Sequence, residues 1–171
     1  IWHGGLSFHG GFLGVLIALW FLGGRTIQGL HQWGDAFALF TPIGLGMGRL
    51  GNFMNSELIG RPTNGSWGMV FDRVDTIPRH PSQLYEATLE GLVLFLLLKV
   101  IDRRTQNTGV LFWSCIAFYG IFRICAEFFR EPDTQLGFVL GPLSLGQLLS
   151  LPMVLIAVVG VIIRLRVPNK R

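Results

Sequence analysis

Long apolar segments separated by shorter polar ones run along the whole of this 171-residue sequence. The final apolar segment, from Gln147 to Arg166, has the length of about 20 residues that crosses the hydrocarbon core of a bilayer. The pattern predicts an all-α protein, a polytopic transmembrane helical bundle that forms a single membrane-embedded domain over residues 1–171. We expect about five spans, at roughly residues 10–23, 36–54, 85–101, 110–128 and 147–166.

The first two predicted spans are rich in glycine. The first is short and opens with Gly10 and Gly11, so we expect its helix to begin before His9. Small residues at helical spacing let membrane helices approach each other closely. Close helix packing is therefore expected around the second span, which contains Gly44, Gly46, Gly48 and Gly51.

The composition supports a membrane protein. Hydrophobic residues make up 50% of the chain and charged residues 14%, and the mean hydropathy is +0.51. A soluble domain usually carries about 25% charged residues, because water solvates ions and the interior of a bilayer does not. An ordinary soluble domain is therefore excluded.

Basic residues gather at the ends of the apolar segments and account for the net charge of +4. If the spans alternate in direction, the clusters lie on one side of the membrane, which the positive-inside rule assigns to the cytoplasm. The C-terminus is then cytoplasmic. Since no basic stripe alternates with aromatic residues, nucleic-acid binding is not expected. The clusters are Arg25; Lys99, Arg103 and Arg104; and Arg164, Arg166, Lys170 and Arg171.

The opposite side of the membrane is predicted to carry two polar segments. The longer, about residues 55–84, contains turn-forming Pro and Asn-Gly residues and nearly balanced charges. Its central part, residues 61–79, is placed either to gate a site or to recognise a substrate peptide. A second outer loop runs from Glu131 to Pro142.

The N-terminal region carries two histidines, His3 and His9, each followed by two glycines. Zinc binding is disfavoured, because residues six apart do not share a helix face and no third ligand lies nearby in sequence. A Ser7–His9 nucleophile pair lacks the strand–turn–helix context of a hydrolase. Two interpretations of His9 stay open, a packed interfacial side chain and a proton-transfer group.

A second motif runs from Gly48 to Gly60. On a helix, Arg49, Asn52 and Ser56 lie on one face, with Asn55 beside them. An arginine within an apolar segment costs roughly 2.5–3.5 kcal/mol at the centre of a bilayer unless it finds a partner or snorkels to the surface. Two asparagines and Glu57 nearby favour a polar pocket over a snorkelling side chain.

A third motif places Tyr119, Arg123, Glu127 and Arg130 at spacings of i, i+4, i+8 and i+11, as a polar stripe on an apolar helix. An Arg123–Glu127 ion pair that neutralises itself accounts for one pair of the stripe. If the stripe faces Arg49, two guanidinium groups converge on one cavity, where their planar forks suit a phosphate group. The excess of arginine is what an anionic ligand would balance.

Two further groups of polar residues give less specific signals. The segment from His80 to Glu86 lies where the outer segment re-enters the membrane, and Gln83 and Glu86 either complete the site or cap a helix. His31 and Trp33 are expected to be interfacial anchors on the cytoplasmic side.

Together these motifs resemble the bacterial prolipoprotein diacylglyceryl transferase family. The resemblance spans nearly the whole chain. It rests on Ser7-Phe8-His9-Gly10-Gly11, on the stretch from Gly48-Arg49-Leu50-Gly51-Asn52-Phe53 to Gly60, on His80-Pro81-Ser82-Gln83-Leu84-Tyr85-Glu86, and on the Tyr119–Arg130 stripe.

The resemblance implies a membrane enzyme that transfers the diacylglyceryl group of phosphatidylglycerol to the lipobox cysteine thiol of prolipoproteins. The expected products are a thioether-linked lipid and glycerol 1-phosphate, in the first step of bacterial lipoprotein maturation. The expected partners are phosphatidylglycerol, a prolipoprotein signal peptide and the lipid bilayer; neither a metal nor a cofactor is required. The expected location is the bacterial cytoplasmic (inner) membrane, with the active site toward the extracytoplasmic side and two further spans of the family before Ile1.

The resemblance also implies roles for individual residues. Arg49 and Arg123 would hold the phosphatidylglycerol head group, and His9 would be the base for the substrate thiol. Tyr119 would support catalysis. The remaining substrate-binding residues implied by the same motifs are Gly10, Asn52, Asn55, Glu57, Gly60, Glu127 and Arg130.

Other classes of membrane protein are compatible with the same arginines. A transporter or channel for an anionic solute would use them to line a pathway, although the sequence has no inverted repeat. A lipid-binding structural subunit would bind head groups without forming a product. Intramembrane proteolysis is disfavoured, because the spans carry no paired aspartates.

Overall fold

The computed structural model describes residues 8–131, 138–140 and 143–166. These residues are mostly helical, which confirms the predicted helical class. The elements in chain order are α1 (Phe8–Leu22), α2 (Ile27–Ala38), α3 (Thr41–Met54), α4 (Ser82–Glu86), the π-helix η1 (Ala87–Val93), α5 (Leu94–Arg104), α6 (Val110–Glu127), β1 (Phe138–Leu140), β2 (Leu143–Ser144) and α7 (Leu145–Arg166).

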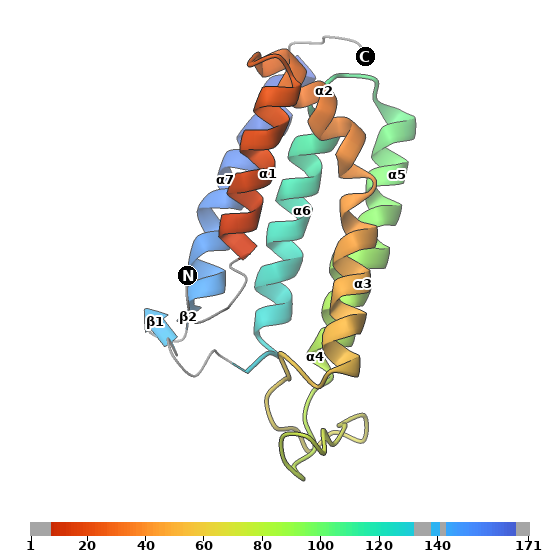
Figure 1. The fold of residues 1–171 in the computed structure, drawn as a ribbon, viewed down its shortest axis with the longest axis vertical. Coiled ribbons are helices and arrows are strands. Elements are labelled where there is room, and N and C mark those ends of the chain that lie inside the picture. The colour runs from red at the N-terminus through yellow and green to blue at the C-terminus, as the bar shows by residue number, and fades with distance from the viewer. Residues whose placement is uncertain (1–7, 132–137, 141–142, 167–171) are drawn as a thin grey trace.

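The long helices form a bundle around α6, roughly parallel to the long axis of the molecule (Figure 1). Helix α7 packs along α6, and α3 packs against η1. Helices α1, α5 and α7 all end at the same end of the bundle, where α2 also lies (Figure 1). Basic residues that follow or close these three helices therefore lie at one end of the described structure, as the sequence predicts. They are Arg25, Arg103, Arg104, Arg164 and Arg166; Lys170 and Arg171 lie outside the described residues.

Two of the described helices are long and apolar enough to cross a membrane, α6 with 18 residues and α7 with 22 residues. In α6, 61% of the apolar window is buried inside the protein, whereas in α7 the buried share is 17%. Most of α7 is therefore available to contact lipid. The apolar part of α1, Gly10–Leu22, is shorter, and the five-span count stays a prediction.

The second predicted span, 36–54, is interrupted in the structure. It is divided between α2 and α3, which meet at Leu39 and Phe40. Pro42 in the first turn of α3 explains the break, because proline has no N–H to donate to the carbonyl of Ala38 one turn earlier. The sequence did not predict the first three-quarters of α2, residues 27–35, although Thr26 caps this helix by accepting a hydrogen bond from the Gly29 N–H at 3.0 Å.

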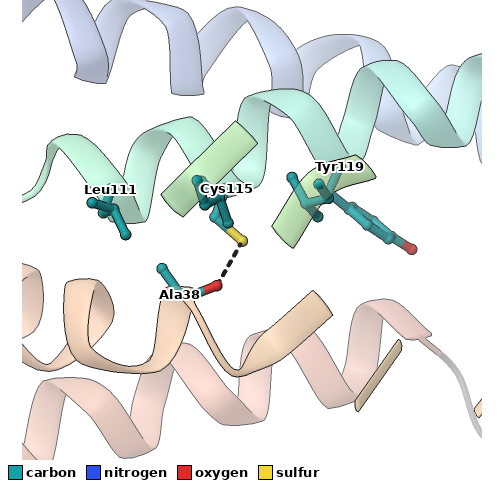
Figure 2. Packing of buried hydrophobic residues seen from close by; sticks show 6 residues of the cluster. Ala38, Leu111, Cys115 and Tyr119 are labelled. Carbon is teal, nitrogen blue, oxygen red and sulfur yellow. Dashed lines mark hydrogen bonds between the residues drawn. The ribbon is translucent and has the colours of Figure 1, made fainter. Parts of the chain in front are cut away.

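The Ala38 carbonyl that Pro42 leaves without a helical donor is buried against α6. Figure 2 shows the Cys115 thiol pointing toward it, with Sγ at 3.8 Å from the oxygen. Ala38 and Cys115 belong to a buried cluster that α2, α5 and α6 form together. Its other members are Leu94, Leu98, Leu111 and Tyr119.

Helix α2 also fixes the start of α6. The buried carboxylate of Asp35 accepts hydrogen bonds from the Gly109 N–H at 2.6 Å and the Phe112 N–H at 2.8 Å. These amides stand at the N-terminus of α6, whose first donors have no helical acceptor. A carboxylate at this position also suits the helix dipole, so Asp35 ties α2 to the helix that the whole bundle surrounds.

The segment between α3 and α4 extends beyond one end of the bundle (Figure 1). It corresponds to the predicted outer polar segment, and its regular pairing is confined to isolated antiparallel bridges. These bridges are Gly60 with Arg130, Pro62 with Arg79, and Met69 with Arg79. Most of the second predicted outer loop, from Glu131 to Pro142, lies outside the described residues.

Candidate functional site

A cavity of about 630 Å³ lies between α1, α2, α3 and α6, with Met153 of α7 at its edge. Apolar side chains and glycines form most of its wall. The exceptions on α3 and α6 are Arg49, Asn52 and Tyr119, together with Thr41 and Cys115. Arg49 and Asn52 are the last lining residues on α3, and Tyr119 is the last on α6. Both helices run toward the end that carries the outer segment (Figure 1), so the cavity changes from apolar to polar in that direction.

Arg49 makes ion pairs with two buried carboxylates on the re-entering helix. Its Nε lies 2.7 Å from Oε2 of Glu86, and its Nη2 lies 3.2 Å from Oε2 of Glu90. The side chains of Glu86 and Glu90 are 1% and 0% exposed. Nε and Nη2 of Arg49 also donate hydrogen bonds to Oε2 of Glu90, at 3.3 and 3.2 Å, so two carboxylates orient a side chain that lines the cavity.

Glu86 is shared by arginines from three segments. Besides Arg49, it pairs with Arg123 on α6, with Nη1 and Oε1 3.2 Å apart, and more distantly with Arg130 at 3.9 Å. Arg123 also pairs with Glu127 one turn later on α6, at 2.7 Å. The predicted meeting of the Arg49 face and the Tyr119–Arg130 stripe is therefore seen, with Glu86 between them.

This cluster corrects one expectation from the sequence. It contains Arg49, Arg123 and Arg130, and it also contains the carboxylates of Glu86, Glu90 and Glu127, so the predicted excess of arginine is wrong. The reason is that α4 and η1 supply two carboxylates to the interior. A second difference concerns the cavity, because Arg123 is not among the described residues that line it.

Tyr119 connects the buried core to the charged cluster. The residue is 5% exposed and belongs to the cluster of Ala38 and Cys115. Figure 2 shows its ring extending away from α6, with the hydroxyl oxygen beyond Cys115. Its neighbourhood includes the charges of Glu90, Arg123 and Arg49. Tyr119 therefore brings a hydroxyl to the polar end of an otherwise apolar wall.

The predicted helix face of Arg49, Asn52 and Ser56 ends earlier than expected. Helix α3 stops at Met54, and Ser56 has a positive φ of 57° outside it. Asn55 and Glu57 are exposed. The backbone carbonyl of Glu57 accepts a 2.6 Å hydrogen bond from Nε2 of Gln83, which fixes the end of α3 against α4.

Gly60 joins the outer segment to the end of the Tyr119–Arg130 stripe. It is buried and pairs with Arg130 in an antiparallel bridge, and α6 itself ends before Arg130, at Glu127. A Cβ on Gly60 would lie 2.2 Å from the His80 carbonyl oxygen and 2.8 Å from that of Phe129. A side chain is excluded here because the backbones of three segments meet.

Arg79 holds the outer segment together from inside. Its Nη1 donates to the Gly60 carbonyl at 3.2 Å and pairs with Glu131, and its Nη2 lies 2.6 Å from Oδ2 of Asp75. The hydrogen bonds from Arg79 hold the pKa of the Asp75 carboxyl below its usual value, and Asp75 in turn raises the pKa of Arg79. The outer segment is thereby fixed near Gly60 and Arg130.

Aromatic side chains surround His80 at the base of the outer segment. Its Nδ1 lies 3.3 Å from the Tyr85 hydroxyl, and its ring packs edge-on against Phe129. The side chain of Gln83 caps no helix end among the described residues and instead donates to the Glu57 carbonyl. That Gln83 completes the site stays a prediction.

His9 and Gly10 lie in the first turns of α1, which begins at Phe8, before His9 as the sequence predicts. The side chain of His9 lies outside the described part of the structure, as do Ser7 and His3. The next residues, Gly11 and Phe12, line the cavity. The role of His9 as a base stays a prediction.

The sequence motifs missed Glu90. It lies within the predicted span 85–101, four residues after Glu86. An ionisable residue inside a membrane span is costly and usually marks a functional site. That signal, together with the shared helix face of Glu86 and Glu90, would have identified it.

Comparison with known proteins identifies the family of the chain. Residues 1–163 match the family model described as prolipoprotein diacylglyceryl transferase. A protein of Geobacter sulfurreducens named phosphatidylglycerol–prolipoprotein diacylglyceryl transferase is 55% identical over 156 residues, which cover 91% of this chain and 60% of that protein. Proteins of the same name from Pseudomonas fluorescens and Pasteurella multocida are 48% and 45% identical, with 91% and 100% of this chain and 59% and 64% of those proteins covered.

The match extends over the segments that build the site, α3, α4 and α6. This chain spans about 60% of the length of the relatives. The agreement of motifs, geometry and overall similarity leads to one conclusion. The chain belongs to the prolipoprotein diacylglyceryl transferase family.

Proposed function

We propose that the protein transfers the diacylglyceryl group of phosphatidylglycerol to the lipobox cysteine thiol of prolipoproteins. A thioether forms between the cysteine sulfur and the glyceryl carbon, and glycerol 1-phosphate leaves. The thiol loses its proton, and the departing phosphate keeps the electron pair of the broken C–O bond. Relatives that cover most of this chain carry the name phosphatidylglycerol–prolipoprotein diacylglyceryl transferase.

One observation carries the proposal. An apolar cavity of about 630 Å³ has Arg49 in its wall at the polar end, where Glu86 and Glu90 orient the guanidinium. Ligand cavities of roughly 300–1,000 Å³ with a few polar groups are typical of small-molecule sites. A phospholipid has the same division into apolar chains and an anionic head group, so the cavity can accept acyl chains while Arg49 binds the phosphate.

The arginines have a second task in the reaction. Negative charge grows on the phosphate as the C–O bond breaks, and preorganised guanidinium groups stabilise such charge strongly in a water-poor site. Arg49 is held in place by Glu86, which also holds Arg123. In this proposal Arg49 binds the phosphate directly, and Asn52 lies beside it in the cavity wall. Arg123 acts on Arg49 indirectly, through their shared partner Glu86.

The substrate thiol must lose a proton to become a good nucleophile, because a free cysteine has a pKa near 8.5. His9 is the proposed base, since it lies on α1 one turn before the cavity-lining residue Phe12. The variant His9→Asn is expected to lose turnover of a peptide thiol while it still binds phosphatidylglycerol. Near-normal turnover by His9→Asn would remove His9 from the mechanism.

The membrane arrangement is part of the proposal. The ends of α1, α5 and α7 that carry the basic clusters face the cytoplasm, and the outer segment and the cluster around Glu86 face the other side of a bacterial inner membrane. Several spans cross the bilayer. Cysteine accessibility labelling in intact cells and in inverted vesicles tests the sidedness, with Asp72→Cys and Arg104→Cys each compared with the parent protein, which already carries Cys115 and Cys125.

The activity is tested with the protein expressed from its complete reading frame. Purified protein is mixed with phosphatidylglycerol and a lipobox cysteine peptide, and the peptide mass is followed. Wild type is expected to add one diacylglyceryl group, Arg49→Ala is expected to lose the product, and Arg104→Ala, at an exposed site on α5, is expected to keep it. Folded protein that binds phosphatidylglycerol but leaves the peptide mass unchanged would favour a transporter or a lipid-binding subunit instead.

A further inference from the structure

We infer that Glu90 is a proton-accepting counter-ion, which releases Arg49 when an anionic phosphate binds and takes up one proton from solution. The inference rests on the proposed function, because it concerns phosphatidylglycerol at the same arginine. It adds a role for Glu90 to the proposed function. The phosphate of the substrate replaces the Glu90 carboxylate as the partner of Arg49, and this replacement is coupled to the uptake of one proton. No covalent bond of the lipid changes in this step; a proton from water is added to the carboxylate of Glu90.

The charge of the cluster makes some compensation necessary. Three arginines, Arg49, Arg123 and Arg130, stand against three carboxylates. The cluster is therefore neutral before any ligand arrives. A phosphodiester adds one negative charge to a buried site, where an uncompensated charge costs several kcal/mol and is relieved by protonation instead.

Of the three carboxylates, Glu90 has the longest contact with its nearest arginine. Glu86 pairs with Arg49 at 2.7 Å and with Arg123 at 3.2 Å, and Glu127 pairs with Arg123 at 2.7 Å. Glu90 uses one oxygen, Oε2, for Arg49 at 3.2–3.3 Å. Among the described residues, its ion pair is with Arg49 alone, and its side chain is 0% exposed.

The charged groups around Glu90 favour protonation at this carboxylate over Glu86. Arg49 faces it from α3, Glu86 from α4, and Arg123 and Tyr119 from α6. Glu86 adds a like charge and disfavours ionised Glu90. If a phosphate engages Arg49, Glu90 loses its direct partner, whereas Glu86 keeps Arg123.

Calorimetry can count the proton directly. A short-chain phosphatidylglycerol is titrated into the full-length protein at pH 7 in two buffers whose ionisation enthalpies differ. The phosphodiester itself does not titrate near neutral pH, so any buffer dependence of the binding enthalpy reports protons taken up by the protein. Wild type is expected to take up close to one proton per lipid. Because binding takes up a proton, the affinity for phosphatidylglycerol should fall as pH rises, by up to about tenfold per pH unit in the range where one full proton is taken up.

Two variants assign the proton. Glu90→Gln is expected to bind phosphatidylglycerol at least as tightly as wild type with proton uptake near zero, because the counter-ion is already neutral. Asp72→Asn removes an exposed carboxylate from the outer segment and is expected to keep the wild-type proton count. Short-chain phosphatidylcholine, whose head group has no net charge, is expected to bind weakly and without proton uptake.

Each contrary result has a distinct meaning. Wild type that binds phosphatidylglycerol without proton uptake overturns the inference and leaves the proposed function intact, and this test does not depend on the folding of any variant. Equal proton uptake by wild type and Glu90→Gln assigns the proton to another group and also overturns the role of Glu90. Absence of phosphatidylglycerol binding by folded wild type overturns the proposed function and the inference together.

Discussion

The guanidinium of Arg49 on α3 and the carboxylate of Glu86 on α4 form a buried ion pair with 2.7 Å between Nε and Oε2. A buried ion pair contributes little net stability, because both groups lose their hydration. Its effect is positional, since it fixes a cavity-lining arginine in one orientation. The same carboxylate orients Arg123, so Glu86 sets the geometry of two arginines from helices distant in sequence.

The planar fork of Arg49 is expected to matter more than its charge. Lysine keeps one positive charge but cannot donate paired hydrogen bonds to a phosphate while it also pairs with Glu86. Arg49→Lys is therefore expected to lower kcat/KM for phosphatidylglycerol by about 10²-fold or more. Arg104→Lys, the same exchange at an exposed position of α5, is expected to leave kcat/KM unchanged. Equal activity of Arg49→Lys and wild type would contradict a paired contact to phosphate.

Gly60 is expected to tolerate no side chain. A Cβ there would lie 2.2 Å from the His80 carbonyl oxygen, so Gly60→Ala must push apart the bridge that holds Arg130. Overpacking of this kind typically costs about 1–3 kcal/mol. We expect a lower thermal unfolding temperature in detergent and a loss of transferase activity, both measured on the same preparation.

Gly14 provides the matched control for Gly60. It lies in α1, and a Cβ built on it meets nothing within 4 Å. Gly14→Ala is expected to keep or slightly raise the unfolding temperature, because alanine favours a helix over glycine by up to about 1 kcal/mol. Similar destabilisation by both substitutions would mean that backbone entropy, and not the contact with His80, decides the effect at Gly60.

The helices could be predicted from apolar segment length, and the boundaries of α6 and α7 differ from the predicted ones by no more than two residues. The break at Leu39 and Phe40 was missed, because the apolar pattern continues through it and Pro42 alone marks it. The start of α2 was missed for the opposite reason. Its residues are mixed in polarity, and the helix is secured by Thr26 and by the contact of Asp35 with α6.

The meeting of Arg49 with the Tyr119–Arg130 stripe could be predicted from the sequence, but the charge of the cluster could not. Arg49 and Arg123 stand out in sequence because arginine is rare in apolar segments. Glu90 was overlooked, although it is equally unusual, because one carboxylate in a long apolar segment has no partner within its own motif. Its pairing with Arg49 depends on α3 and η1 packing together, which no local spacing reveals.

The outer segment is expected to loosen in acid at the Asp75–Arg79 pair. Arg79 lowers the folded-state pKa of Asp75, so the pair stabilises the segment above the unfolded-state pKa of about 3.9 and loses this effect as pH falls through the lower folded value. Between pH 7 and 5 no change is expected. The protection factor of the Ile77 amide, the ratio of its intrinsic to its observed hydrogen-exchange rate, should fall below that window, because this amide donates to Asp75 Oδ1 at 3.1 Å. Asp75→Asn should show the low protection factor already at pH 7, and a high protection factor in this variant would contradict the role of the pair.

The apolar cavity is the last feature to test, because it separates a lipid site from a site for a soluble anion. Gly44 lines the cavity, and a Cβ on it meets nothing within 4 Å. A leucine at this position therefore fits the fold and occupies space that acyl chains would need. Gly44→Leu is expected to raise KM for phosphatidylglycerol about tenfold, the loss of roughly 1.4 kcal/mol of binding, while kcat at saturation stays near wild type. Gly14→Leu, an equally open glycine that does not line the cavity, is expected to leave KM unchanged. If Gly44→Leu binds long-chain and short-chain phosphatidylglycerol as wild type does, the acyl chains lie elsewhere, and Arg49 must receive the head group from another direction.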